Sequence, residues 1–542
     1  MNKTFGFLIG SFCVALLAAE KSRGNACSSA GNSLVSRPNV VLIMCDDMGF
    51  SDLGCYGSEI ETPNIDALAN EGIRFSNFKN AGRCCPSRAS LLTGRYQHSV
   101  GMGWMTVVDE HRPGYRGQIT GEVPTIAEVF KANGYSTYMS GKWHVTVDGS
   151  WRPEEDAAPN GSWPTQRGFD EFYGSLSGGG NYYKVKGLKR NTTAITDFPK
   201  GYYYTHAITK HAVEFIEHHN TEKPMFMYLA HYAPHVPLQA PAERVEKCKA
   251  RYAVGYDVLR QQRFQRLEKL GLIPSGKKLP ANNGEFDEAV RVDWSDLSEE
   301  KKEVWVEEMA TYAAMIEVVD DGIGEVVNTL KKKGMYENTY FLFLSDNGGS
   351  ARQSKLARLR ADLTNTPYRL YKCFTYSGGI SSPLIIKAPE SILFEGSLRH
   401  DLAHITDVFP TCLDLAGVEY PETFHGEPIS GPDGISLLPA LRGDSLPERD
   451  LFFEHQTSCA VISGDYKLVR VDSRTPWELI DLKADPFETT DLSSRYPEKA
   501  IELEKKWTAW ATRNHVFPLE EREWKERVIY YKEKYPDQRG DR

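Results

Sequence analysis

The segment of this 542-residue chain with the most suggestive chemistry is a short one in which a cysteine is followed closely by Pro and Arg. Residues 83–95 read Arg-Cys-Cys-Pro-Ser-Arg-Ala-Ser-Leu-Leu-Thr-Gly-Arg. Pro86 suits the first position of a helix and Gly94 suits the residue after its last turn. We therefore expect Cys84 just before a short helix, where free N–H groups favour an anion, with Arg88 one turn along. The alternative is a surface turn with two chance cysteines, since such helix starts are common.

Two pairs of oxygen-bearing side chains follow two apolar, β-rich runs of the sequence. Asp46 and Asp47 form one pair, and Asp346 and Asn347 form the other. Adjacent carboxylates repel each other, so a buried pair requires a cation, whereas a solvated Asp-Asp turn requires nothing. The four side chains offer only oxygen ligands, which suit Ca²⁺ or Mg²⁺, whereas zinc sites usually add His or Cys.

Basic side chains follow two further expected strands. Lys142 and His144 come after the strand expected at 135–139 and are two residues apart, so in an extended segment they point the same way. His235 lies between two prolines on a stiff loop after the run at 225–230. A basic loop at a strand end is the alternative for the first pair, and a lone His is usually structural.

Apolar runs and helical segments alternate at short spacing, which predicts a mainly parallel sheet with helices on both faces. The expected strands are 39–44, 73–78, 135–139, 225–230, 339–344 and 383–386, and the expected helices are 63–70, 126–132, 206–219 and 305–330. Ligands gather beyond the carboxyl ends of such strands, so the acidic and basic residues that follow them should converge. Residues 151–204 are expected to form long surface loops, and 240–303 an insertion.

From about residue 448 the pattern changes to short alternating strands. They are expected at 460–462, 466–471 and 477–480, and a helix is expected at 497–512. This pattern fits a small antiparallel sheet with a helix attached to the main domain. We therefore expect a main domain over residues 38–447 and a C-terminal subdomain over residues 448–542.

The N-terminus has the pattern of a secretory signal peptide within residues 1–26. Lys3 provides a positive start, an apolar core runs from Phe5 to Ala19, and cleavage could follow Ala19 or Ala26. The core is too short to span a bilayer comfortably, and no later run is long and apolar enough to do so. Cys27 suggests lipoprotein anchoring, but the residues before it make a poor lipobox. We expect a secreted or periplasmic protein without a membrane span.

Composition narrows the class of protein. The length suits one large α/β domain plus a smaller one, and 41% hydrophobic with 25% charged residues is ordinary for a soluble globular protein. The net charge of −9 argues against a nucleic-acid-binding surface. The ten cysteines are scattered without a regular spacing that would suggest disulfide pairs, which argues for buried free thiols and against a disulfide scaffold.

The pattern Cys-x-Pro-Ser-Arg, with Leu-Thr-Gly beginning four residues after its Arg, resembles the maturation signature of the type I sulfatases. In that family the cysteine is oxidised after translation to formylglycine, an aldehyde that hydrates to a gem-diol, and by resemblance Cys84 is that residue. The resemblance runs from about Pro38 to the C-terminal helix. Residues 238–272 and 369–379 and the ending resemble bacterial arylsulfatases most closely. The resemblance implies an alkaline-phosphatase-like fold.

The resemblance also implies a set of site residues and partners. Calcium would be held by Asp46, Asp47, Asp346 and Asn347, together with the hydrated aldehyde at Cys84 and a substrate oxygen. The family's other catalytic residues carry over to Arg88, Lys142, His144, His235 and Lys372. The implied partners are a sulfate ester and a formylglycine-generating, sulfatase-maturating enzyme.

The implied mechanism begins when calcium and the surroundings of Arg88 lower the pKa of one gem-diol hydroxyl. That oxygen attacks sulfur in line and forms a covalent sulfate ester. Calcium, Arg88, Lys142 and Lys372 hold the charge of the transferring group. His235, aided by Lys372, protonates the leaving alcohol or phenol, and His144 helps to remove the proton of the second hydroxyl, so that sulfate is expelled.

An arylsulfatase-type hydrolase of sulfate monoesters is the function we expect. The alternatives are a carbohydrate sulfatase of the same family, a phosphonate or phosphate ester hydrolase of the same superfamily, and a secreted calcium-binding protein without catalysis. Aromatic residues in loops could select the substrate or be plain surface aromatics; they are His98, Trp104, His111, Tyr182 and Tyr183.

Overall fold

The computed structural model describes residues 37–148, 161–281, 292–389, 392, 394 and 396–536. The predicted signal peptide with its cleavage sites, and parts of the loops around residues 155 and 285, lie outside these described residues. The chain from Arg37 onward belongs to one compact unit. Within the described ranges all eight cysteines are free thiols, as expected, and no helix has the length and apolar character needed to cross a membrane.

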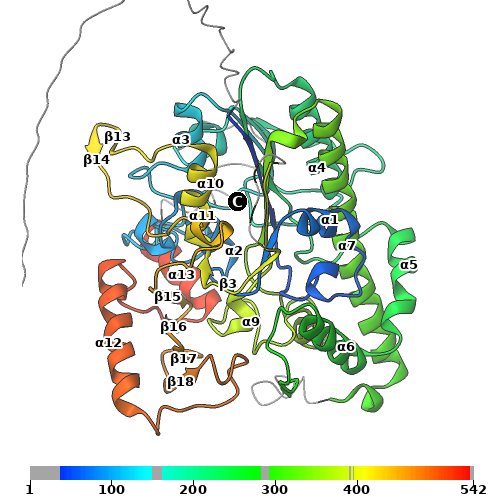
Figure 1. Ribbon diagram of the computed structural model, residues 1–542, viewed down its shortest axis with the longest axis vertical. Coiled ribbons are helices and arrows are strands. Elements are labelled where there is room, and N and C mark those ends of the chain that lie inside the picture. Colours follow the sequence, from blue (N-terminus) through cyan, green and yellow to red (C-terminus); the bar gives the residue numbers. More distant parts are fainter. Residues whose placement is uncertain are drawn as a thin grey trace, which may run out of the picture. The chain divides into compact units, whose positions relative to one another are not determined.

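A ten-stranded mixed sheet lies at the centre of this unit (Figure 1). Four neighbouring strands in its middle run parallel: β9 (Thr339–Ser345), β1 (Asn39–Cys45), β8 (Met225–Ala230) and β4 (Ser136–Gly141). Beyond β9 lie β10 (Leu384–Lys387), β2 (Ile73–Phe75) and β11 (Leu398–Arg399), and beyond β4 lie β5 (Glu171–Ser175), β6 (Leu188–Arg190) and β7 (Thr193–Ala194). Because β10 is antiparallel to β9, the sheet is mostly but not wholly parallel.

Both faces of the sheet are covered, which explains the continuous apolar runs in the sequence. Every residue of β1 is buried, and its side chains alternate between two cores. Val41 and Ile43 belong to the core on one face, whereas Val40 and Leu42 belong to the core on the other. A strand packed on both sides needs apolar side chains at every position rather than at every second one.

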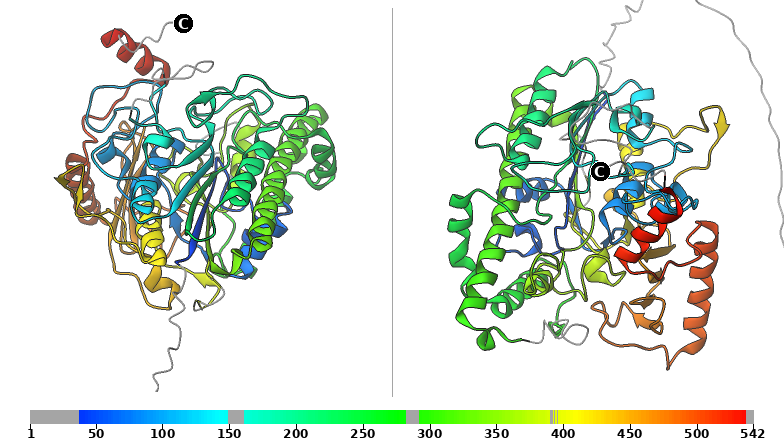
Figure 2. Two further views of the ribbon diagram at one scale, coloured as in Figure 1. Left: turned by 90° about the horizontal axis from the view of Figure 1, so that it is seen from above. Right: turned by 180° about the vertical axis from the view of Figure 1, so that it is seen from behind.

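Helices cover the two faces as expected (Figures 1 and 2). One face packs against α1 (Pro63–Asn70), α4 (Tyr204–His218), α5 (Ala242–Tyr252), α6 (Tyr256–Lys269), α7 (Glu299–Lys332) and α8 (Ala357–Thr364). The other face packs against α2 (Cys84–Thr93), α3 (Ile126–Ala132), α10 (Val408–Ala416) and α11 (Leu438–Leu441). The short α9 is Ser377–Ile380, and two small strand pairs are β3 (Phe78–Lys79) with β12 (Ala403–His404) and β13 (Thr423–Phe424) with β14 (Glu427–Pro428).

Three local predictions are corrected by the structure. The expected strand at 73–78 is divided into β2 and β3, which pair in different sheets. The supposed loops at 151–204 contain β5, β6 and β7, which form through pairing with β4 and with one another rather than through a strong apolar pattern. The helix expected to begin after Cys84 begins at Cys84 itself, because Pro86 is tolerated anywhere in the first turn, where N–H groups lack helical partners.

The C-terminal part contains a four-stranded antiparallel sheet with a helix, as expected. Its strands are β15 (Asp450–His455), β16 (Ser458–Ser463), β17 (Tyr466–Arg470) and β18 (Glu478–Asp481), and α12 (Pro497–Arg513) packs on one face. The sequence analysis missed β15 and the last helix, α13 (Trp524–Lys534). Only two residues of α13 are buried, so its apolar pattern is weak.

The second face of this small sheet packs against the loop that carries Lys372. Apolar residues of β15 and β16 share a core with Leu370 and Tyr376. Glu488 accepts hydrogen bonds from the backbone N–H and the hydroxyl of Ser377, both at 2.8 Å, and forms a buried ion pair with Lys467. The C-terminal sheet and Glu488 therefore fix the position of the Lys372 loop.

This buried ion pair gives a stability prediction. Replacing Glu488 with Gln leaves the ammonium of Lys467 buried without a counter-charge, and such a change costs about 3–5 kcal/mol of unfolding free energy. The matched control is Asp465→Asn, which removes the pair with Lys483 across 3.8 Å, where both side chains are more than half exposed. That change should cost less than about 1 kcal/mol. Urea unfolding measures both, and equal effects would contradict the assignment.

Candidate functional site

The predicted site residues meet at the carboxyl ends of the four parallel central strands. Asp46 and Asp47 follow β1, Asp346 and Asn347 follow β9, Lys142 and His144 follow β4, and His235 follows β8. Lys372 comes from the loop between α8 and α9, and Cys84 and Arg88 come from α2. Each of these residues is at most 4% exposed except His235, whose side chain is 16% exposed. The site therefore opens to solvent at His235.

Buried oxygen atoms without partners mark the acidic part of the site. Oδ1 of Asp46, Oδ2 of Asp47 and Oδ1 of Asn347 are fully buried and have no hydrogen-bond partner among the described residues. Leaving buried oxygen atoms unpaired is costly unless a cation approaches them. Burial and the nearby carboxylate of Asp46 raise the pKa of Asp346 well above its usual range, which shows how closely negative charge is packed. This donor set fits a hard, oxygen-preferring cation such as Ca²⁺.

Arg88 is directed at the acidic cluster rather than at open space. Its Nε and Nη2 donate to Oδ2 of Asp346 at 3.1 and 2.9 Å, and its Nη1 donates to the backbone oxygen of Lys142 at 3.0 Å. Because the guanidinium is planar and fully buried, these bonds fix the carboxylate and the chain after β4 relative to α2.

Two lysines complete the charge balance of the cluster. The ammonium of Lys142 pairs with Asp46, and that of Lys372 pairs with Asp47. Burial acts to raise the pKa of Asp47, but Lys372 and His235 outweigh it and hold that pKa well below its usual range. Asp47 is therefore ionised at any pH near neutrality and available as a ligand.

Cys84 lies beside a second group of side chains. Its Sγ, the Sγ of Cys85 and a ring nitrogen of His144 all lie within 4.8 Å of one another, and Cys85 Sγ is 3.2 Å from His144 Nε2. A hydrogen bond from Cys85, followed by the charges of Lys142 and Lys372, lowers the pKa of the Cys84 thiol in spite of its burial. Burial and Lys142 lower the pKa of His144 to about 4, so this imidazole is neutral at pH 7.

Backbone conformation at the site is unusual at two of these residues. Asp47 has φ of 67° and His144 has φ of 58°, both in the left-handed region that non-glycine residues rarely adopt. Such strain persists where surrounding contacts fix it and is concentrated at functional sites. Space for His144 depends on Gly178, where a Cβ atom would lie 2.3 Å from the His144 Nε2.

His235 presents one defined ring nitrogen to the site. Its Nδ1 lies 3.0 Å from the Tyr232 hydroxyl and 2.5 Å from the backbone oxygen of Val236, so Nδ1 carries the proton of the neutral ring. Nε2 then faces Oδ2 of Asp47 at 3.8 Å. The Tyr182 hydroxyl donates to the backbone oxygen of His235 at 2.8 Å and so supports the loop.

The sequence analysis missed several neighbours of the site. The Tyr228 hydroxyl lies 3.4 Å from Arg88 Nη1, and the Lys142 ammonium lies 5.2 Å from the ring centroid of Tyr232. Arg83 caps α2 and its Nη1 lies 2.5 Å from Cys373 Sγ. The sequence feature that could have indicated these neighbours is the pair of tyrosines in and just after β8, Tyr228 and Tyr232, because β8 also precedes His235.

The five aromatic residues that the sequence analysis singled out in loops lie in different surroundings. His98 is buried against Glu454, Trp104 is buried against Trp524 and His111 packs on Tyr535, so these three are structural. Tyr182 is buried beneath the His235 loop, and Tyr183 beside it is 41% exposed.

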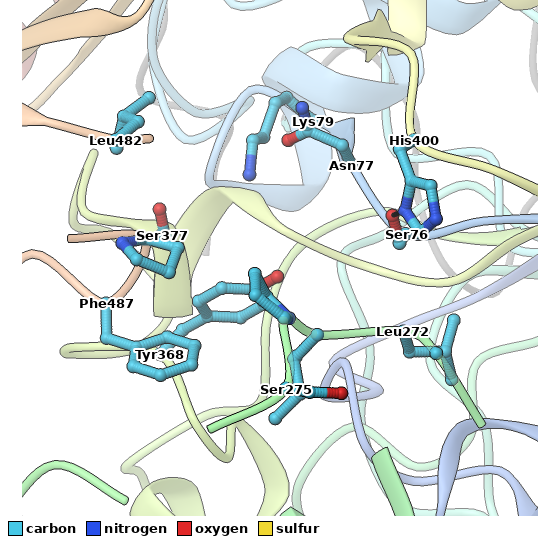
Figure 3. A pocket seen from close by; sticks show the side chains of 14 residues that line it. Ser76, Asn77, Lys79, Leu272, Ser275, Tyr368, Ser377, His400, Leu482 and Phe487 are labelled. Carbon is cyan, nitrogen blue, oxygen red and sulfur yellow. Dashed lines mark hydrogen bonds between the residues drawn. The ribbon is translucent and has the colours of Figure 1, made fainter. Parts of the chain in front are cut away.

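A separate cavity of about 490 Å³ lies away from this cluster (Figure 3). Lys79, Tyr368, Ser377 and Phe487 line it, and none of the predicted site residues does. Lys79 donates to Ser381 at 2.7 Å, and burial together with Lys467 lowers its pKa to about 7.

Comparisons with known proteins agree with this geometry. Residues 38–418 match the family model described as sulfatase, and residues 368–512 match the one described as N-sulphoglucosamine sulphohydrolase, C-terminal. An uncharacterised sulfatase of Schizosaccharomyces pombe is 31% identical and the match covers 89% of this chain and 94% of its own. The arylsulfatase of Klebsiella aerogenes is 32% identical over 74% of this chain and 91% of its own.

The solved structures show the same fold. Ps i-CgsB in complex with k-i-k-neocarrahexaose is 26% identical, with a TM-score of 0.66 over 94% of this chain and 100% of that one. The expected alkaline-phosphatase-like architecture is therefore confirmed. Because a family model matches most of its length and a 31% identical relative matches 89% of it, the chain belongs to the sulfatase family.

Proposed function

We propose that this sulfatase hydrolyses sulfate monoesters, of the arylsulfatase type, through a formylglycine formed from Cys84 and a calcium ion held by Asp46, Asp47, Asp346 and Asn347. The observation that carries the proposal is the set of unpartnered, fully buried oxygen atoms on Asp46, Asp47 and Asn347, at the strand ends where Cys84 also lies. We infer that residues 38–447 form the catalytic domain and that residues 448–542 support it.

The two groups supply the chemistry and the chain supplies position and charge. When present, the aldehyde hydrate supplies the attacking oxygen and calcium supplies Lewis acidity. Lys142 and Lys372 lie beside the carboxylates, where they can hold the negative charge that develops on the sulfate oxygens. Arg88 keeps Asp346 in place.

The two histidines have separate proton-transfer roles in this proposal. His235 lies at the solvent-facing side, where its ring can take up a second proton, and in this imidazolium form its Nε2 can donate a proton to the leaving oxygen. His144 is buried and neutral beside residue 84, so it can accept a proton there and assist the release of sulfate.

We further propose that the protein is secreted or periplasmic and that a formylglycine-generating, sulfatase-maturating enzyme modifies Cys84. The motif at 84–88 and the pattern of residues 1–26 support both parts. Intact-mass analysis of the mature protein tests them together. It should show a chain shortened at Ala19 or Ala26 in which one thiol is replaced by an aldehyde.

The central test compares kcat/KM on matched sulfate and phosphate esters of one phenol. The proposal expects the sulfate ester to be preferred by the matured enzyme. A preference for the phosphate or phosphonate ester would favour the other hydrolase class of the superfamily. Absence of turnover on all esters, with calcium binding intact, would favour a non-catalytic calcium-binding protein.

His235 gives a prediction about leaving groups. His235→Ala removes the proton donor, so kcat on an alkyl or saccharide sulfate should fall by about 10²–10⁴-fold. The loss should be much smaller on 4-nitrophenyl sulfate, whose leaving group needs little protonation. Steady-state kinetics on both esters measures this difference. The control is His218→Ala, an exposed histidine at the end of α4. Equal losses on the two esters would contradict the role of His235.

A further inference from the structure

The cavity of about 490 Å³ that lies away from the candidate site is large enough for a ligand of its own (Figure 3). Residues 76–79 around β3, residues 271–275 after α6 and residues 482–487 after β18 contribute most of its lining. Ligand pockets fall at roughly 300–1,000 Å³, so this volume suits a small molecule. Ser275 and His400 in the lining are exposed, so the cavity meets solvent on their side.

Lys79 contributes a buried ammonium to this cavity. The residue is 4% exposed, and its side chain extends from β3 toward Ser377 in Figure 3. Of its three N–H donors, one bonds to the hydroxyl of Ser381 at 2.7 Å, and the ammonium has no ion-pair partner among the described residues. A buried charge without a counter-charge is costly. The position therefore favours an anion beside Lys79.

The charged groups around Lys79 do not supply that counter-charge. Glu488 attracts Lys79, but its carboxylate already forms a buried ion pair with Lys467 and accepts two hydrogen bonds from Ser377. Lys467 repels Lys79, and this repulsion adds to the effect of burial in lowering the pKa of Lys79 to about 7. None of the 14 lining residues, all within the described ranges, is Asp or Glu. The surroundings therefore carry an excess of positive charge when Lys79 is protonated.

The wall beside this ammonium is mainly apolar. Leu272, Ile273 and Phe487 in the lining are each at most 4% exposed. The ring centroid of Tyr368 lies 6.3 Å from that of Phe487 and 5.5 Å from the Lys79 Nζ, so the charge and the apolar wall are adjacent. An inorganic anion would pair with Lys79 but leave this wall facing water, whereas an organic anion with an apolar body would cover it.

From these observations we propose that this cavity binds a small organic anion, whose carboxylate pairs with Lys79 and whose apolar body lies against Phe487 and Tyr368. The site is separate from the candidate catalytic cluster, none of whose residues lines it, so the inference goes beyond the proposed function and does not depend on it. An occupant contacts both ends of the loop that carries Lys372, because Tyr368 precedes that loop and Ser377 follows it.

Fluorine NMR of 4-fluorophenylacetate in the presence of the full-length mature protein tests the proposal. Broadening of the fluorine line should give a Kd below about 10 mM. The neutral analogue 4-fluorophenylacetamide has nearly the same shape and should bind about tenfold more weakly, because it carries no charge to pair with Lys79. Inorganic sulfate at the same concentration should displace little of the carboxylate probe, because it cannot cover the apolar wall.

Variants assign the binding to this cavity. Lys79→Met removes the charge, keeps most of the apolar stem, and should weaken the binding of 4-fluorophenylacetate by about tenfold. The matched control is Lys483→Met, because this lysine follows Leu482 of the lining, lies outside the lining itself and has an 80% exposed side chain. Its Kd should equal that of wild type. Thermal unfolding shows whether each variant is folded.

A second variant decides the matter if Lys79→Met does not fold. Ser275→Trp places an indole at an exposed position of the lining, so it should close the cavity without disturbing the core and should abolish binding of the probe. Undetectable binding to wild type, or equal Kd values for the carboxylate and the amide, would overturn the proposal. So would wild-type affinity in folded Lys79→Met or Ser275→Trp, or full displacement of the probe by equimolar sulfate.

Discussion

Replacing Cys84 with alanine should abolish sulfate ester hydrolysis, with a fall in kcat of about 10³-fold or more. The neighbouring thiol of Cys85 should not take over the attack, because burial raises its pKa well above the usual range and keeps it protonated. Stability should change by only about 1 kcal/mol, because the substitution removes only the small group on Cβ of residue 84, a thiol before maturation and an aldehyde after it. Sulfate release under saturating substrate, together with thermal unfolding, measures both effects.

The matched control for Cys84→Ala is Cys412→Ala. Cys412 is a fully buried free thiol on α10, so its replacement also removes one small buried group, but from a position away from the charged site residues. The control should lose a similar amount of stability and keep its kcat. Cys84→Ser should also be inactive wherever the maturating enzyme acts only on cysteine. Substantial activity in Cys84→Ala would show that the nucleophile lies elsewhere.

Removal of calcium should inactivate the enzyme and lower its stability together. An ion present at a thousand times its Kd contributes about 4 kcal/mol to the folded state, and chelation removes that contribution. The effect should be large here because Asp46, Asp47 and Asn347 would be left with buried oxygen atoms that have no hydrogen-bond partner among the described residues. Differential scanning calorimetry with added Ca²⁺ and with a chelator measures the shift, and sulfate release follows activity in the same samples.

A variant identifies the ligands responsible for that effect. Asp47→Asn should remove most of the stabilisation by Ca²⁺ and most of the activity, because Asp47 is held ionised by Lys372 and His235. The control is Asp66→Asn, a carboxylate in α1 bonded to Thr62 and Cys55 and outside the cluster. It should leave the response to Ca²⁺ as in wild type. Equal melting temperatures with and without Ca²⁺ in wild type would contradict a resident calcium ion.

Most of the central sheet and its functional edge could be predicted from residue patterns. Strand segments such as 40–44 and 340–344 are apolar at every position because both of their faces are covered, and this gives a strong signal in the sequence. The sequence pattern of strands β5 to β7 and β15 gives a weaker signal, because short strands form through pairing with neighbouring strands. Helix α13 was missed because only Arg527 and Tyr531 in it are buried.

The order of strands and polar residues along the chain already indicates which side chains could do chemistry and that they lie at one edge of a sheet. Asp46, Asp346, Lys142 and His235 follow four strands, and parallel strands place their carboxyl ends together. The partners of each side chain, in contrast, are known only from the folded chain. Arg88 binds Asp346, the side chain of His235 stays 16% exposed, and α13 lies near Cys373. No local pattern encodes these arrangements, because they join segments tens to hundreds of residues apart.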